Sequence, residues 1–201
     1  MKKTFLLPAL LLAGAAHAQT NALKVDIFQP IINTAALSFE HKLSETSSFQ
    51  LGLSGTFGYK DGAYYSGYSG PSTSGFAITP EYRLYLSEKH AALEGFYVAP
   101  FVRYQNLTLK DSYSYTDYDA NGSPVSRTSN DEASLDTYGG GIVVGRQWIF
   151  KQRFSLDTFL GPSYNSGTVK YKSTSNGSGS LDPGTFTGFG LRAGVTFGLA
   201  F

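Results

Sequence analysis

His41 and His90 are the residues best suited to acid–base or nucleophilic chemistry outside the first 18 residues. A nucleophilic mechanism needs Ser or Thr beside such a base, and a carboxylate that orients the base. Glu40 precedes His41, but neighbouring residues of a strand point to opposite faces, so these two side chains do not form a dyad. His90 lies in a short polar segment that favours a solvated turn. The sequence therefore predicts no catalytic residue and a protein that is not an enzyme.

One segment has oxygen ligands at calcium-loop spacing. Asp117, Asp119 and Asn121 stand at alternate positions before Gly122, as in the first half of such a loop. Thr128 occupies the position at which the bidentate Glu is expected. The chain has no cysteine, which excludes thiolate metal sites, disulfides and lipoprotein acylation. We predict no metal site and no cofactor.

A third set of candidate residues consists of charged side chains in segments with alternating hydrophobicity. Their phase places them opposite the apolar face, and they comprise four cations and four carboxylates: Lys24, Asp26, Glu40, Glu81, Arg83, Arg103, Asp157 and Arg192. An eight-stranded barrel is just wide enough for side chains to fill it. Balanced charges in such a lumen favour a packed salt-bridge network over a ligand site or a pore, and a narrow channel remains an alternative.

Eight segments with a period of two must position these charges. Apolar and polar residues alternate over 22–28, 35–42, 49–59, 75–86, 96–109, 134–150, 154–164 and 184–201. Strands that are apolar on one face and polar on the other are typical of a barrel wall between lipid and a polar lumen. The sequence predicts an all-β fold, an eight-stranded antiparallel up-and-down transmembrane β-barrel. Residues 139–146 are apolar in both phases, so the faces of the sixth strand are not assigned.

The connections between these segments alternate in length. Residues 43–48, 87–95 and 151–153 form short turns, whereas 60–74, 110–133 and 165–183 form long links rich in Ser, Gly, Tyr and Asn. Long outer loops and short periplasmic turns are typical of outer-membrane barrels. Tyrosine among small polar residues favours protein contacts. We therefore expect the outer loops to bind an extracellular partner through Tyr64, Tyr65, Tyr68, Tyr113, Tyr115, Tyr118 and Tyr171.

Both ends of the sequence favour the same compartment. Lys2 and Lys3, the apolar residues 5–16 and the small residues Ala16 and Ala18 form a signal-peptide pattern. We expect cleavage after Ala18, which divides the chain into a signal peptide (1–18) and an outer-membrane β-barrel (19–201). Removing two lysines from 16 basic residues leaves 14 against 15 acidic ones, a net charge of −1. This balance predicts no nucleic-acid partner.

The last predicted strand closes on Phe201 after strict alternation. A terminal aromatic strand of this kind resembles the signal by which barrel-assembly machinery recognises outer-membrane proteins. Aromatic residues also gather near both ends of the predicted strands, where membrane barrels have aromatic belts. We expect outer-membrane lipid and the assembly machinery as partners, and a monomeric barrel.

Three segments carry a family resemblance. Residues 37–41, 79–86 and 95–104, including Pro80-Glu81-Tyr82-Arg83 and Tyr97-Val98-Ala99-Pro100, resemble small outer-membrane barrels of the Bacteroidota, a family of unknown function. The resemblance implies a porin-like barrel of the outer-membrane protein A or X architecture in a Gram-negative cell, and no catalytic or ligand residues. We predict a structural or surface-interaction role. The alternatives are a lipid-binding or lipid-modifying barrel, a narrow channel and, more distantly, a soluble ligand-binding barrel.

Overall fold

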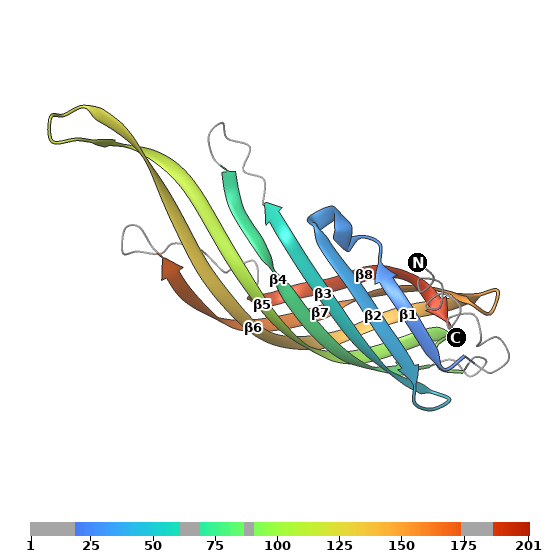
Figure 1. The fold of residues 1–201 in the computed structure, drawn as a ribbon. Helices are drawn as coiled ribbons and strands as arrows, with labels where there is room; N and C mark the ends of the chain where they lie inside the picture. The colour runs from blue at the N-terminus through green and yellow to red at the C-terminus, as the bar shows by residue number, and fades with distance from the viewer. Residues whose placement is uncertain (1–18, 61–68, 87–90, 174–186) are drawn as a thin grey trace, which may run out of the picture.

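The chain folds into one closed antiparallel barrel of eight strands (Figure 1). The computed structural model describes residues 19–60, 69–86, 91–173 and 187–201. Each strand pairs with the next one along the chain, and β1 closes the ring by pairing with β8. The predicted all-β, eight-stranded antiparallel architecture is confirmed. In chain order the strands are β1 (Asn21–Asp26), β2 (Thr34–Lys42), β3 (Ser47–Lys60), β4 (Ser69–Tyr85), β5 (Gly95–Tyr118), β6 (Pro124–Phe150), β7 (Phe154–Ser173) and β8 (Gly188–Ala200).

The seam between the first and last strands is regular. Val25 lies opposite Phe197, and Ala22 lies opposite Ala200. Phe201 follows the last strand and continues the pairing, since its carbonyl accepts the Asn21 N–H at 2.9 Å and its own N–H donates to Asn21 at 2.9 Å. Residues 196–199 are therefore paired on both sides, with β1 and with β7.

The walls differ in height, and four predicted strand boundaries were wrong for that reason. Residues 110–133 were expected to be a loop, but β5 and β6 pair without interruption from Gly95–Gln147 to Tyr118–Pro124. The strand β7 likewise continues to Ser173, and β4 begins at Ser69. Polar Ser, Thr and Tyr residues are compatible with strands when cross-strand partners are present. The hairpin reverses at an Asx turn, in which the Asp119 side chain accepts the N–H groups of Asn121 and Ser123.

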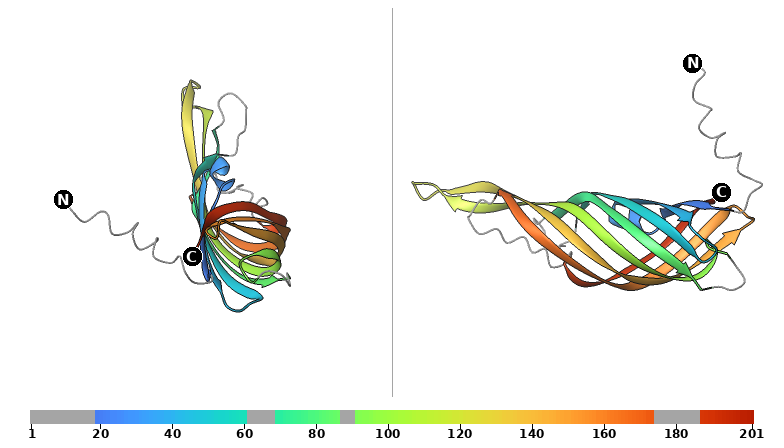
Figure 2. Two further views of the ribbon diagram at one scale, coloured as in Figure 1. Left: turned by 90° about the vertical axis from the view of Figure 1, so that its right-hand side faces the viewer. Right: turned by 90° about the horizontal axis from the view of Figure 1, so that it is seen from below.

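This tall hairpin extends well beyond the rest of the barrel rim (Figures 1 and 2). On the opposite side of the ring, β1 and β2 are joined by a short 3-10 helix, η1 (Gln29–Ile32). The tight turns Lys151–Arg153 and Leu43–Thr46 lie at the other end. One end of the barrel therefore carries short turns and the other carries long projections, as the alternation of connection lengths predicts.

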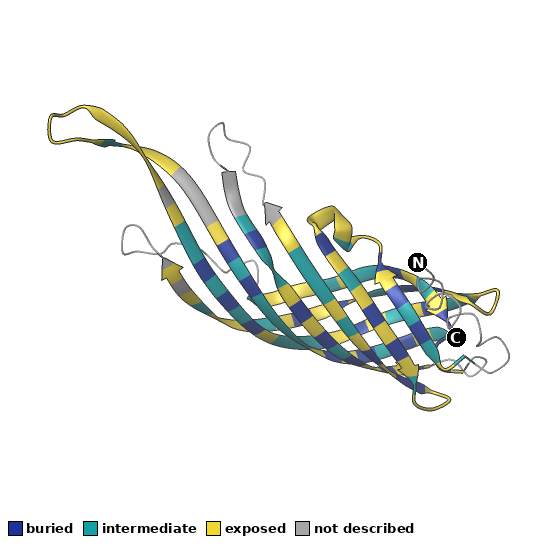
Figure 3. Cartoon of the chain, in the orientation of Figure 1, coloured by how far each residue is buried: buried dark blue, intermediate teal, exposed yellow. Residues whose placement is uncertain are grey.

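Burial alternates along the strands (Figure 3). On β4 the side chains of Glu81 and Arg83 are at most 1% exposed, whereas Tyr82 and Leu84 are more than 40% exposed. The outer surface is consequently apolar and the lumen is polar. A membrane-crossing helix, long and apolar over at least 18 residues, does not occur in the parts of the chain that the structure describes.

The structure also assigns the faces of β6, which the sequence left open. Val143 and Gln147 are fully buried in the lumen, whereas Ile142 and Val144 are more than half exposed on the outside. Gly145 lies on the lumen phase beside Tyr97, and a Cβ atom at this position would overlap the end of the Tyr97 ring. The glycine therefore makes room for an aromatic side chain that crosses the lumen.

Candidate functional site

Arg83 is the centre of a buried ion-pair cluster in the lumen. Its Nε donates to Glu81 Oε1 at 2.7 Å, and its Nη1 donates to Asp157 Oδ2 at 2.8 Å and to Glu40 Oε2 at 3.4 Å. The side chains of all four residues are fully buried. The guanidinium thus joins carboxylates from β2, β4 and β7 across the barrel.

Two further cations complete the cluster. Lys24 Nζ lies 2.6 Å from Glu40 Oε2 and 3.2 Å from Asp157 Oδ2. Arg192 Nη1 lies 2.7 Å from Glu81 Oε2. We name Lys24, Glu40, Glu81, Arg83, Asp157 and Arg192 the lumen cluster. Its three cations balance its three carboxylates, so no net charge is buried.

Neutral side chains add further hydrogen bonds to the cluster, although Arg83 Nη2 and Gln147 Nε2 have no partner in the described structure. Gln147 Oε1 accepts from Lys24 at 2.8 Å and from Arg83 at 3.1 Å. Tyr97 donates its hydroxyl to Asp157 at 2.8 Å, and Tyr85 donates to Glu40 at 2.7 Å. Ser48 also donates to Glu40. The sequence analysis did not identify these roles. The alternation on β4 and β5 does indicate that Tyr85 and Tyr97 point into the lumen. Gln147 could not be placed, because the sequence did not show which residues of β6 face the lumen.

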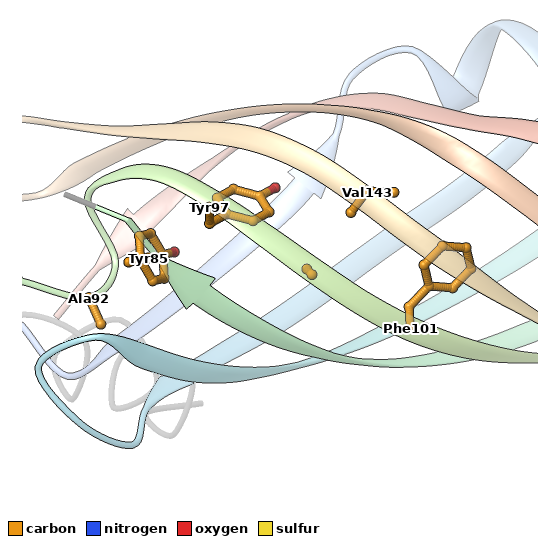
Figure 4. Packing of buried hydrophobic residues seen from close by; sticks show 6 residues of the cluster. Tyr85, Ala92, Tyr97, Phe101 and Val143 are labelled. Atoms are coloured by element: carbon orange, nitrogen blue, oxygen red, sulfur yellow. The ribbon is translucent and has the colours of Figure 1, made fainter.

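Aromatic rings surround the cations. The Arg83 guanidinium lies 4.3 Å from the Tyr97 ring centroid, and Arg192 lies 4.4 Å from Phe101 and 4.6 Å from Phe159. Tyr97 and Phe101 belong to a buried group with Tyr85, Ala92, Ala99 and Val143 (Figure 4). The rings exclude water from the ion pairs and contribute cation–π attraction.

The structure places two predicted members, Asp26 and Arg103, outside the lumen cluster. The Asp26 carboxylate accepts the backbone N–H groups of Phe28 at 2.9 Å and Gln29 at 3.0 Å, and so anchors the start of η1. Arg103 Nε donates to the Thr79 hydroxyl at 3.3 Å. Within the described ranges, neither residue forms a salt bridge with the cluster.

The geometry favours a structural role for the lumen cluster. Removing one partner from a buried ion pair typically costs about 3–5 kcal/mol, because an uncompensated charge stays behind. Every carboxylate of the cluster accepts from at least two donors, and no histidine contacts it among the described residues. The arrangement joins five strands, β1, β2, β4, β7 and β8, and provides no free base.

The other described candidates for chemistry form no hydrogen bond with this cluster. His41 faces outward and its Nδ1 lies 2.8 Å from Asn21 Oδ1, whereas His90 lies outside the described residues. In the calcium-like segment, Asp117 pairs with Arg127 at 2.7 Å and Asp119 holds the hairpin turn. No grouping of three or more acidic or histidine side chains suited to a metal occurs in the described part of the chain.

The predicted contact tyrosines are described only in part. Tyr115 and Tyr118 lie near the tip of the β5–β6 hairpin, 37% and 68% exposed. Tyr113 and Tyr171 lie on β5 and β7, but their side chains fall outside the described part. The remaining three, Tyr64, Tyr65 and Tyr68, lie outside the described residues.

Comparison with known proteins yields one family. A search of curated proteins returned no match. The family model described as "Protein of unknown function (DUF3575)" matches residues 4–182, which is most of the chain. The protein with this closed eight-stranded barrel therefore belongs to the DUF3575 family of proteins of unknown function.

Proposed function

We propose that this protein is a non-enzymatic outer-membrane barrel that presents a rigid β-hairpin to partners outside the cell. The observation that carries the proposal is the β5–β6 hairpin, which continues the barrel wall beyond the rim as a paired ribbon (Figure 1). A structured projection on a barrel with a filled lumen is better suited to contact than to transport or catalysis.

The outer surface supports the membrane part of the proposal. Its exposed apolar residues lie on every strand; one from each is Val25, Leu37, Leu53, Ile78, Val102, Val144, Leu160 and Leu191. A soluble protein rarely exposes a continuous apolar surface larger than a few hundred Å². A lipid bilayer would cover this band around the whole barrel.

Aromatic residues border the band on both sides. The outer girdle contains ring neighbours on adjacent strands, with centroid distances of 4.9–6.0 Å: Phe76, Tyr104, Tyr138, Tyr164 and Phe189. The inner girdle contains Phe96, Trp148, Phe154 and Phe197. Phe154 and Tyr164 are ten residues apart on β7. At about 3.4 Å per residue and a tilt of about 40°, they are separated by about 26 Å in height, close to the apolar band of a membrane barrel.

Charged pairs begin directly beyond the outer girdle. Asp136 lies 3.6 Å from Lys170, and Glu132 lies 3.1 Å from Lys172 and 3.5 Å from Lys110. The hydrogen bond from Lys172 holds the pKa of Glu132 below its ordinary value. Such pairs belong in water, so the wall above the girdle fits an extracellular position.

The buried lumen cluster supports a closed barrel rather than a channel. Lys24, Glu40 and Arg83 meet across the lumen with no exposed side-chain surface. An ion crossing this level would have to displace several buried salt bridges. The same satisfied hydrogen bonds disfavour a lipid-modifying enzyme that uses these residues.

The remaining parts of the proposal concern targeting and assembly. Residues 1–18 act as a cleaved signal peptide, and barrel-assembly machinery inserts the barrel of residues 19–201 by recognising its aromatic β8 strand with Phe201. The proposal also includes that the barrel has the outer-membrane protein A or X architecture and that the protein comes from a member of the Bacteroidota. The barrel is a monomer whose apolar band contacts outer-membrane lipid.

Replacement of residues 113–129 by an Asn-Gly turn tests the contact role, since Ser112 pairs with Asn130 and this turn suits a two-residue hairpin. Folding is checked by heat-modified mobility on gels. A photo-crosslinking residue is placed at position 118, and at Gln152 in the opposite turn as a control. We expect adducts on living cells from position 118 only. Two results together contradict the contact role. The truncated barrel folds and retains every surface phenotype of the parent, and position 118 yields no adduct.

A further inference from the structure

A polar cavity of about 70 Å³ lies in the lumen beside the lumen cluster. It is larger than the roughly 10–15 Å³ that one water molecule requires. Its polar lining includes two guanidinium groups, one carboxylate and several neutral side chains: Arg103, Arg192, Asp26, Gln50, Thr79 and Thr196. Among the described residues, the lumen therefore contains a chamber that side chains leave unfilled.

Arg103 is the cation of this chamber that forms no salt bridge among the described residues, although the Asp26 carboxylate lines the same chamber. The lumen cluster is balanced without it, because Glu81 already pairs with both Arg83 and Arg192. Asp26 accepts two backbone N–H groups and lies within 3.4 Å of Gln29 Nε2. The one side-chain hydrogen bond that the described residues give Arg103 runs from Nε to Thr79, so its terminal nitrogens carry donors with no described acceptor.

Two buried polar atoms of the lining are also without a partner in the described structure. They are Thr196 Oγ1 and Gln50 Oε1, on side chains that are 6% and 3% exposed. Buried hydroxyl and amide groups are normally hydrogen-bonded. The Thr196 hydroxyl can donate a proton to an occupant of the cavity. A half-turn of the Gln50 amide presents its NH₂ group in place of the oxygen.

We propose that this cavity binds one small monovalent anion, of the size of a halide, nitrate or formate. The Arg103 guanidinium supplies the charge and terminal N–H donors, and Thr196 and Gln50 supply neutral donors. Arg192 contributes positive potential while it remains paired with Glu81. A cation does not fit this site, because two guanidiniums line it and the carboxylate of Asp26 is already engaged.

The experiment uses bromide as the probe and the barrel folded in detergent. Crystals of the wild type and of Arg103→Gln are grown with sodium bromide, and anomalous differences locate the ion. In solution, the unfolding midpoint of both proteins is measured with increasing bromide. Arg146→Gln is the matched control, because Arg146 lies on the outer surface between Phe96 and Trp148.

We expect an anomalous peak in the cavity of the wild type and of Arg146→Gln, and none in Arg103→Gln. Bromide should raise the unfolding midpoint of the wild type and of Arg146→Gln, since a ligand stabilises only the state that binds it. The midpoint of Arg103→Gln should not change with bromide. Should Arg103→Gln not fold, Thr196→Val replaces it, with a weakened peak expected. A wild-type cavity that holds only water, or a bromide response that Arg103→Gln shares, overturns the proposal.

Discussion

Replacing Arg83 by Met tests whether the lumen cluster stabilises the barrel. The substitution removes ion pairs at 2.7, 2.8 and 3.4 Å and leaves three carboxylates with two cations, Lys24 and Arg192. Because all these side chains are fully buried or nearly so, one negative charge remains without compensation in the lumen. We expect the free energy of unfolding to fall by about 3–5 kcal/mol, the range for breaking a buried pair.

The measurement is urea unfolding of the barrel in lipid vesicles. Trp148 is the one tryptophan of the chain, and it lies in the inner girdle, so its fluorescence reports insertion of the wall. Arg127→Met is the matched control, because Arg127 forms an exposed pair with Asp117 on the hairpin. That loss should stay below about 1 kcal/mol, as for exposed salt bridges.

A double substitution sharpens the test. Asp157→Asn removes one carboxylate, so Arg83→Met with Asp157→Asn restores two cations against two carboxylates. The double variant should lose clearly less stability than the sum of the single variants, since residues in one network couple. If the losses add, or if Arg83→Met loses less than about 1 kcal/mol, the cluster does not stabilise the barrel in the way that its geometry implies.

Two further predictions concern particular positions of the wall. Gly145→Ala should lower the unfolding midpoint in urea, because the new Cβ would displace the Tyr97 ring from Asp157. Gly52→Ala is the comparison, because its Cβ would meet nothing closer than 3.5 Å, and equal losses would contradict the packing argument. The pKa of Glu132 in the folded protein is lowered from its ordinary value of 4.5. Its pair with Lys172 therefore stabilises the folded state fully above pH 4.5, and this stabilisation is lost as the pH falls through the lowered pKa. The protection of amides near the top of β6 and β7, corrected for their intrinsic exchange rates, should therefore fall in acid, and Glu132→Gln should remove that fall. A fall in protection that survives in Glu132→Gln refutes the assignment.

Much of the barrel follows from period-two patterning. The phase of Glu81 and Arg83 on β4 was readable because Tyr82 and Leu84 alternate with them. Charge in the lipid phase is costly, so the phase of the apolar residues also places the charged ones. Residues 139–146 gave no such contrast, because glycines and aliphatic residues occupy both phases, and the inward position of Gln147 stayed hidden.

Long-range geometry accounts for what the sequence did not reveal. Lys24 and Asp157 are 133 residues apart and meet only because barrel closure pairs β1 with β8, the neighbour of β7. Alternation places Arg103 and Asp26 inward, but it does not show which partner either side chain contacts. The height of the hairpin was missed because Ser, Asp and Asn in residues 110–133 favour loops locally, whereas continuous pairing between β5 and β6 extends the wall.

The central claim, a membrane barrel whose hairpin lies outside the cell, is tested most directly by single-cysteine labelling. The chain has no cysteine, so Tyr118→Cys and Gln152→Cys each introduce one thiol at opposite ends of the barrel. A membrane-impermeant maleimide is applied to intact cells and to cells with a permeabilised outer membrane. The account predicts labelling at position 118 in both and at position 152 only after permeabilisation. Labelling of position 152 but not 118 on intact cells, or recovery of the protein in the soluble fraction, would contradict it.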